Sequence, residues 1–376
     1  MSKKRGNGEG SIHRRKGGGW CTQYTVYTAD GRKRKTLYGK TRQEVATKLA
    51  KALSDRESGL NFDAEGLKLG EYLSRWLEDS VKDTVRNTTY ARYEQISRTH
   101  IVPMLGSVKL KTLSPTHVRS LYKEKLSSLS PRTVQYIHVT LHKALKQAVN
   151  DGLIPRNATE AVKPPQVRRK EIRPLTPEQV KVLLDAASGD RLEALYTLAV
   201  HTGLRQGELL GLKWEDVDLE SGSLHVKRTL TTARGGPRLA APKTKGSRRR
   251  VSLTKGAVDA LRAHLARQLE EIDRAGSLWQ EIGLVFASVT GRPLNRHDLT
   301  TRQFKPLLER AGLPRKTRFH DLRHTCATLL LTKNVNPKVV SEMLGHSSIA
   351  ITLDTYSHVL PNMQDSAARA LEEALR

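Results

Sequence analysis

The sequence is poor in cysteine and contains no long apolar run. Cysteine occurs twice among 376 residues, at Cys21 and Cys326. Two cysteines so far apart give neither a disulfide framework nor a local pair of metal ligands, and they fit a reducing compartment such as the cytoplasm. No apolar stretch is long enough to cross a bilayer, and the basic N-terminus lacks the apolar segment of a signal peptide. We therefore expect a cytoplasmic protein with no membrane contact and no disulfides.

Acidic residues are also scarce relative to basic ones. The chain has 38 Asp+Glu against 65 Lys+Arg, which gives a formal net charge of +27. A protein this basic most often binds a polyanion, although a solvated basic surface without a partner is the alternative. The length allows two or three domains, each with its own core. The charge therefore predicts a multidomain protein that binds nucleic acid.

Residues 1–60 form the most basic part of the chain, with 15 Lys+Arg against 5 Asp+Glu, or 15 − 5 = +10. Trp20–Thr28 is rich in β-branched and aromatic residues, and a turn signal separates it from a second extended segment, Arg32–Tyr38. Thr41 and Glu44 have the spacing of a helix N-terminal cap. This pattern predicts a small sheet backed by one helix, whose basic hairpin enters a DNA groove. A basic surface hairpin without a partner is the alternative.

The period of the apolar residues becomes helical from Leu69 onward. Pro115 and Pro131 each follow a capping serine and predict further helices. We expect an all-α domain over residues 68–163, whose scattered basic side chains follow DNA phosphates. Its first apolar stripe comprises Leu69, Tyr72, Leu73, Trp76 and Leu77. Residues 164–174 are basic and proline-rich, which predicts a linker between domains.

Residues 175–376 read as a mixed α+β domain. Helices are expected at 192–200, 255–274 and 299–311, and strands at 224–230 and 251–253. A small amphipathic tail helix is expected at 365–375. The predicted fold class is thus multidomain and mainly α with small β-sheets: an N-terminal β-sheet plus helix domain, an all-α domain and a mixed α+β catalytic domain.

Thr317–His358 places His320, Arg323, His346 and Tyr356 close together in the chain. Phosphodiester cleavage without a metal needs guanidinium groups to hold the phosphate oxygens and a proton donor for the leaving oxygen. A tyrosine nucleophile conserves the bond energy in a covalent intermediate, so no nucleotide cofactor is needed. The sequence offers these parts in Arg205, Lys243, His320, Arg323, His346 and Tyr356. It has no metal-ligand spacing and no phosphate-binding Gly-rich loop, so we expect no metal and no cofactor.

These six residues lie in five motifs. The motifs are His201-Thr-Gly-Leu-Arg205-Gln-Gly-Glu-Leu-Leu, Pro242-Lys243-Thr-Lys, His320-Asp-Leu-Arg323-His-Thr, Leu344-Gly-His346-Ser-Ser and Thr355-Tyr356-Ser-His. Together and in this order they closely resemble the tyrosine recombinases, the phage integrase family, over residues 174–360. Residues 68–160 resemble the core-type DNA-binding domain of that family. Residues 10–58 resemble the arm-type DNA-binding domain of phage and conjugative-element integrases.

The resemblance implies a role for each of the six residues. Arg205 and Arg323 would clamp the scissile phosphate, and His346 would hold one of its oxygens. Tyr356 would attack phosphorus to leave a 3′-phosphotyrosine, with His320 assisting proton transfer at the tyrosine. Lys243 would act as general acid for the 5′ hydroxyl.

Five further residues lie in or beside these motifs. Lys245 is the alternative general acid, because hairpin lysines two residues apart are easily misaligned. Glu208 and Asp321 are interpreted as residues that orient the catalytic groups. His324 is interpreted as a supporting or packing residue, and Cys326 belongs to an apolar stripe and is expected in the core.

The resemblance also implies partners. We expect double-stranded DNA with core-type and arm-type attachment sites, and a homotetramer acting on two duplexes to integrate and excise a mobile element. An excisionase and a host DNA-bending protein are further candidate partners. The alternatives are a DNA-binding protein with an inert site and a type IB topoisomerase; the N-terminal hairpin, the His-x-x-Arg motif and the two histidines favour the recombinase. The sequence leaves open the attachment site, the preferred direction, a phage, conjugative-element or plasmid origin, and docking of the tail in cis or in trans.

Overall fold

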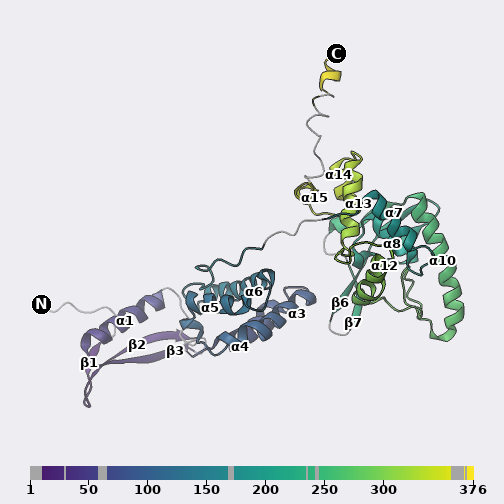
Figure 1. The fold of residues 1–376 in the computed structure, drawn as a ribbon. Coiled ribbons are helices and arrows are strands. Elements are labelled where there is room, and N and C mark those ends of the chain that lie inside the picture. Colours follow the sequence, from purple (N-terminus) through teal and green to yellow (C-terminus); the bar gives the residue numbers. More distant parts are fainter. Residues whose placement is uncertain are drawn as a thin grey trace. The chain divides into compact units, whose positions relative to one another are not determined.

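The computed structural model describes residues 11–28, 31–57, 66–167, 173–233, 236–241, 245–356, 368 and 371–376. The chain divides into two compact units, Met1–Arg169 and Lys170–Arg376. Figure 1 shows that both are built mainly of helices, accompanied by small antiparallel sheets. The predicted fold class is therefore confirmed. Of the predicted tail helix, residues 365–367, 369 and 370 lie outside the described residues, while 368 and 371–374 are helical.

A three-stranded antiparallel sheet opens the first unit, in the order β1-β2-β3. Its elements are β1 (Ile12–Arg14), β2 (Trp20–Thr28), β3 (Gly31–Gly39) and α1 (Arg42–Glu57). The helix α1 packs on β2 and β3 (Figure 1), where Tyr24, Leu49 and Ala52 form a small core. The Glu44 amide donates to Thr41 Oγ1 over 3.1 Å, which caps α1 as the spacing predicts. The hairpin and its helix are thus as expected, with the turn at 29–30 outside the described residues.

The rest of the first unit is a helical bundle with short 3-10 and π turns. Its elements are α2 (Leu69–Arg75), η2 (Trp76–Val81), α3 (Asn87–Ile96), η3 (Ser97–Ile101), α4 (Val102–Leu105), η4 (Leu110–Thr112), α5 (Pro115–Leu126) and α6 (Pro131–Asn150). Ser130 Oγ accepts from the Thr133 amide and caps α6. Ile137, Leu141 and Leu145 on one face of α6 are fully buried in the core of the bundle. The π turns η2 and η3 extend α2 and α3, and the sequence did not predict them.

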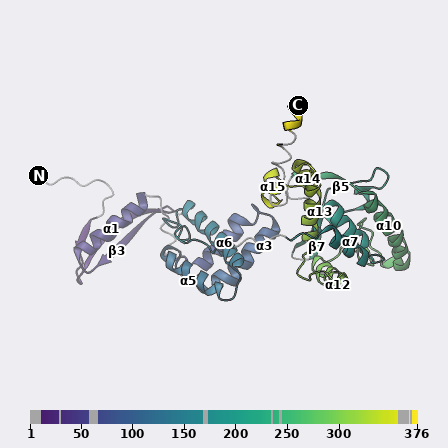
Figure 2. The same ribbon diagram turned by 45° about the horizontal axis from the view of Figure 1, so that its top comes forward.

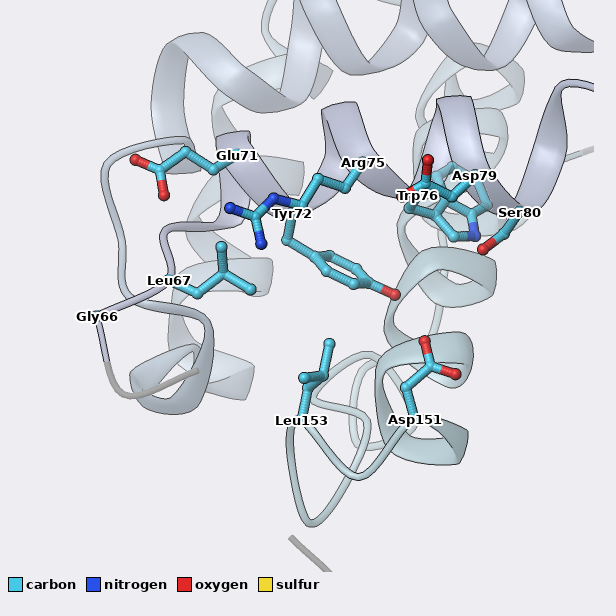
Figure 3. A pocket seen from close by; sticks show the side chains of 10 residues that line it. All are labelled: Gly66, Leu67, Glu71, Tyr72, Arg75, Trp76, Asp79, Ser80, Asp151 and Leu153. Atoms are coloured by element: carbon cyan, nitrogen blue, oxygen red, sulfur yellow. The ribbon is translucent and has the colours of Figure 1, made fainter. Parts of the chain in front are cut away.

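A pocket of about 470 Å³ opens in this bundle beside α2 and the end of α6. Figure 3 shows Glu71, Asp79 and Asp151 around it, with Arg75 as the basic side chain among its lining residues. The Tyr72 ring forms part of its wall, and the Tyr72 hydroxyl donates to the Ala144 carbonyl over 2.7 Å. None of the six predicted catalytic residues lines this pocket. All six belong to the second unit, so the candidate site is described there.

The second unit carries two small sheets among its helices. Its elements are α7 (Pro177–Ala186), α8 (Glu193–Thr202), α9 (Gln206–Leu209), η5 (Trp214–Asp216), β4 (Val217–Asp218), β5 (Ser223–Val226), β6 (Thr229–Ala233), β7 (Gly236–Ala240), η6 (Lys245–Ser247), β8 (Arg249–Ser252), α10 (Lys255–Ala275), η7 (Gly276–Leu278), α11 (Arg296–Asp298), η8 (Leu299–Phe304), α12 (Lys305–Arg310), α13 (Asp321–Thr332), α14 (Pro337–Leu344) and α15 (Ile349–Tyr356). One sheet has the order β4-β5-β8, and β6 pairs with β7 in the other.

The single strand predicted over 224–230 is wrong, because the chain forms two strands there in different sheets. Lys227 and Arg228, between β5 and β6, both pair with Asp216, Lys227 at an N···O distance of 2.9 Å. Consecutive side chains of a strand point to opposite faces. Both can reach one carboxylate only where the strand is interrupted, and this interruption starts the β6–β7 hairpin.

Helix α8 is almost continuously buried, and its end is fixed by Gly203, which adopts a left-handed conformation with φ of 61°. Helix α14 ends in the same way at Gly345, with φ of 66°. Both views in Figures 1 and 2 show α13, α14 and α15 side by side, and Leu331, Val340 and Leu344 form a core between them. The packing brings the ends of α8 and α14 to the first turn of α13. Among the described residues, no helix is both long and apolar enough to span a membrane.

Candidate active site

Arg323 lies in the first turn of α13 and is 3% exposed. Its Nη1 donates to the Gly203 carbonyl over 2.8 Å, and its Nη2 donates to the Leu344 carbonyl over 2.7 Å. Both acceptors lie at helix ends, where carbonyls have no partner within the helix and carry partial negative charge. Within the described part of the chain, Arg323 forms no ion pair with a carboxylate. Arg323 therefore joins three segments and keeps its positive charge.

Arg205 follows Gly203 and precedes α9. Glu208 accepts from Arg205 twice, through Oε1 from Nη1 at 2.8 Å and through Oε2 from the backbone amide at 3.0 Å. This is the contact that their spacing of three residues predicts. Arg205 Nη2 donates to the Gly345 carbonyl over 3.1 Å. Arg205 and Arg323 thus meet at the end of α14.

Arg249 on β8 is a third arginine of this cluster, and the sequence reasoning missed it. Its Nη2 donates to Glu208 Oε2 over 3.0 Å, and its Nε donates to the Met343 carbonyl over 2.6 Å. Strand alternation could have found it, because the apolar Val251 lies two residues further on and is buried in the core. Residues two apart in a strand share a face, so Arg249 had to point inward.

The charges of this cluster do not cancel. Glu208 is 4% exposed, and it is the carboxylate that Arg205 and Arg249 share. Burial favours the neutral form of Glu208, but the charges of Arg249 and Arg205 outweigh it and hold its pKa below the usual value. Burial and then the charge of Arg205 lower the pKa of Arg323 to about 9. Three guanidiniums against one carboxylate leave a net positive site, which favours an anion.

Two of the predicted histidines lie at this positive site. His346 follows Gly345, and its Nδ1 is 2.7 Å from Thr352 Oγ1 on α15. Burial, followed by the charges of Arg323 and Arg205, lowers the pKa of His346 to about 4. His320 precedes α13, and burial, followed by neighbouring His324 and Arg323, lowers its pKa to about 4. Both imidazoles are therefore neutral at pH 7, and each has one N–H to donate.

Tyr356 ends α15 and is 1% exposed. Its ring packs with Leu331, Val340 and Leu344, and its hydroxyl oxygen is 2.7 Å from His324 Nδ1. Burial raises the pKa of Tyr356 to about 12, although the charge of Arg323 opposes the rise. The interpretation of His324 as a supporting or packing residue missed this direct contact. A spacing of 32 residues between the two gives no local signal for it.

The remaining predictions concern residues around this cluster. Lys243 lies outside the described residues, so the choice between it and Lys245 stays a prediction. Asp321 pairs with Arg318, with 2.7 Å between Oδ1 and Nη2, and orients the chain just before α13. Cys326 is 4% exposed, and burial raises the pKa of its thiol to about 12, as suits the core position predicted for it.

Three helix ends thus converge on one positively charged point: the end of α8, the start of α13 and the end of α14. They carry Arg205, Arg323 and His346, while α15 supplies the phenol of Tyr356. No group of three or more His, Cys, Asp or Glu side chains that could hold a metal ion occurs among the described residues. The arrangement suits binding of a phosphate by guanidiniums and neutral imidazoles next to a buried phenol.

Comparison with known proteins supports the resemblance to the phage integrase family. Residues 173–363 match the model of the phage integrase family, and residues 68–126 match that of the phage integrase N-terminal SAM-like domain. The chain is 34% identical to a XerC-like tyrosine recombinase of Caldanaerobacter subterraneus, over 90% of this chain and 92% of the relative. It is 29% identical to the ICEBs1 integrase of Bacillus subtilis, over 76% of this chain and 78% of the relative.

Two solved structures share the fold at lower identity. The Tn1549 transposon integrase, solved with transposon right end DNA, matches with a TM-score of 0.69 and 22% identity, over 82% of this chain and all of the other. A lambda integrase dimer bound to a core site matches with a TM-score of 0.58 and 20% identity, over 95% of this chain and 96% of the other. The motifs, the matched family models and the 34% identical relative lead to one assignment. The chain belongs to the phage integrase family of tyrosine recombinases, enzymes that cut and rejoin DNA strands during the site-specific integration of mobile elements.

Proposed function

We propose that this recombinase cuts DNA through Tyr356, which forms a 3′-phosphotyrosine with the scissile strand. One observation carries the proposal: three guanidiniums gather beside a buried phenol, and a single carboxylate pairs with only two of them. A site of this charge binds a phosphate, and a phenol next to a bound phosphate can attack it.

The proposed reaction proceeds in one displacement at phosphorus. Arg205 and Arg323 bind the non-bridging oxygens, which gain negative charge as phosphorus becomes five-coordinate, and His346 donates to one of them. The Tyr356 hydroxyl passes its proton to a neighbouring imidazole as the bond from its oxygen to phosphorus forms. The bond from phosphorus to the 5′ oxygen breaks in the same step, and Lys243 protonates that oxygen. The phosphotyrosine conserves the energy of the broken bond, so a 5′ hydroxyl from the other duplex can reverse the step and rejoin strands.

We further propose how the chain engages DNA. Residues 1–60 bind arm-type sites, residues 68–163 bind core-type sites, residues 164–174 link the parts, and residues 175–376 form the catalytic domain. The DNA-bound Tn1549 integrase and a lambda integrase tetramer bound to a Holliday junction support DNA as the partner and a homotetramer as the active assembly. In this proposal the enzyme acts on DNA in the bacterial cytoplasm, aided by an excisionase and a host DNA-bending protein.

A core-site suicide substrate, which loses a short strand after cleavage, tests the nucleophile. Tyr356→Phe should abolish the covalent protein–DNA product on a denaturing gel while DNA binding in a mobility-shift assay persists. Tyr196→Phe is the matched control, because Tyr196 is equally buried at 1% exposure but lies in α8, away from the arginine cluster. Covalent product from Tyr356→Phe at the level of the control would refute the assignment of Tyr356.

A further inference from the structure

Tyr356 forms a hydrogen bond with His324, a residue outside the six predicted catalytic residues. His324 lies one turn after His320 on α13, and the two rings meet edge to face with their centroids 5.0 Å apart. The Tyr356 hydroxyl is 2.7 Å from His324 Nδ1, which is within the range for direct proton transfer. By contrast, no hydrogen bond joins His320 to Tyr356 among the described residues. The residue that contacts the phenol is therefore His324, which the sequence motif indicates only as a supporting or packing residue.

We propose that His324 accepts the Tyr356 proton during strand cleavage and returns it during rejoining. The inference rests on the proposed function, since it requires Tyr356 to be the nucleophile. It makes His324 a catalytic residue and leaves His320 to support it by contact between the rings. The opposite role for the same hydrogen bond is to restrain Tyr356 and so slow its attack on phosphorus. Substitution of His324 slows cleavage if it is a base and speeds cleavage if it is a restraint.

The surroundings of His324 keep its imidazole neutral, so that Nδ1 can accept a proton. The titratable and charged groups that face it are Arg318, His320, Asp321 and Arg323 on its own helix and the preceding turn, His346 after α14, and Tyr356 on α15. Burial lowers the pKa of His324, Asp321 opposes this, and Arg318 and Arg323 add to it. His324 is therefore neutral at pH 7, and in the tautomer with hydrogen on Nε2 the phenol donates to Nδ1.

The proton balance closes without any further reagent. As the bond from the tyrosine oxygen to phosphorus forms, electron density leaves that oxygen and its proton becomes acidic, so it passes to His324 Nδ1. The bond from phosphorus to the 5′ oxygen breaks, and that oxygen takes a proton from the general acid at the other end. His324 becomes a cation next to the five-coordinate phosphorus, whose oxygens gain negative charge in the transition state, and this attraction favours the proton transfer. Rejoining runs the same transfers in reverse.

Single-turnover cleavage of the core-site suicide substrate by the full chain tests the role. His324→Gln keeps a hydrogen-bonding group near the phenol but cannot take a proton, and His324→Ala removes the contact. Both should cleave at least about 100-fold more slowly, as loss of a general base does, with unchanged DNA binding. The rate of each variant should rise tenfold per pH unit from pH 7 to 9, because hydroxide then removes the proton. His225→Gln on β5, an exposed histidine, is the matched control and should cleave normally.

An unnatural tyrosine and a modified DNA substrate distinguish a general base at position 324 from a residue that only positions the Tyr356 ring. Incorporation of 3,5-difluorotyrosine at position 356 makes the phenol more acidic, so it should restore His324→Gln by tenfold or more and change the unsubstituted enzyme little. A 5′-bridging phosphorothiolate, whose leaving group needs no proton, should not restore His324→Gln. Restoration by the phosphorothiolate would instead place His324 at the leaving group and overturn the proposal.

Three other results would also overturn it. Normal cleavage by His324→Gln would show that hydrogen bonding alone suffices, and faster cleavage would show that His324 restrains Tyr356. A slow variant with a flat pH profile and no response to difluorotyrosine would show a positioning role. Failure of the proposed function is distinguishable, because it would appear as covalent product from Tyr356→Phe whatever the behaviour of His324.

Discussion

Replacement of Arg249 by lysine should damage both the stability of the catalytic unit and its activity. The Arg249 side chain is 7% exposed and donates three hydrogen bonds, to Glu208, to the Met343 carbonyl and to the Ser247 carbonyl. Lysine keeps the charge but has a single nitrogen, which cannot reach three acceptors lying in different directions. At least one buried acceptor is then left without its partner.

The structure sets the size of the effect. A buried acceptor that loses its donor costs about 1–3 kcal/mol, so Arg249→Lys should lower the free energy of unfolding by about that amount. Arg249→Met removes the charge as well, and breaking a buried ion pair costs about 3–5 kcal/mol. Because Glu208 also holds Arg205, we expect cleavage to slow about 10- to 100-fold in Arg249→Lys, as loss of one or two such charged hydrogen bonds implies.

Urea unfolding and single-turnover cleavage of the suicide substrate measure the two effects. Arg250→Lys is the matched control, because Arg250 is the next residue on β8 and is exposed. The control should unfold and cleave like the unsubstituted protein. Equal stability and equal cleavage in Arg249→Lys and Arg250→Lys would show that the contacts of Arg249 do not organise the site.

Two further substitutions probe the same cluster. Gly345→Ala puts a Cβ at a φ of 66°, and that Cβ lies 2.8 Å from Arg249 Nη1. Gly189→Ala is the control, because it meets similar backbone strain at a φ of 73° but its Cβ lies in open space. Gly345→Ala should lose about 1 kcal/mol or more of unfolding free energy beyond the control in urea unfolding, and equal losses would contradict the contact with Arg249. Glu208→Gln should cost about 3–5 kcal/mol at pH 7. Because the folded pKa of Glu208 is lowered, its carboxylate stabilises the fold above the unfolded pKa, and this contribution disappears as pH falls through the folded pKa. The difference from the unsubstituted protein should therefore shrink in acid, and a constant difference from pH 7 to 3 would contradict the linkage.

Features set by local spacing could be predicted from the sequence. Arg205 and Glu208 are three residues apart and do pair, and Thr41, three residues before Glu44, does cap α1. Capping residues with following prolines located the starts of α5 and α6. In each of these cases the interacting groups lie within one helical turn, so the sequence pattern contains the whole interaction.

Features set by packing between distant segments could not be predicted. Arg249 meets Glu208 across 41 residues and the Met343 carbonyl across 94, while Tyr356 meets His324 across 32. No periodicity relates such positions, because their approach depends on how α8, α13 and α14 pack. The break between β5 and β6 was missed for the same reason, since Asp216, which pairs with Lys227 and Arg228 at the break, lies in another segment.

Arg323 is buried, and its hydrogen-bond acceptors are neutral carbonyls, which explains how the site keeps its positive charge. A carboxylate on Arg323 would satisfy the guanidinium but would cancel the charge that a phosphate needs. The Gly203 and Leu344 carbonyls satisfy it equally well in geometry, at 2.8 and 2.7 Å, and contribute only partial charge from the helix ends. With its pKa near 9, Arg323 remains protonated at pH 7 even with no anion bound. The two left-handed glycines therefore do more than end their helices, because they turn the chain where the carbonyls can hold the Arg323 cation without cancelling its charge.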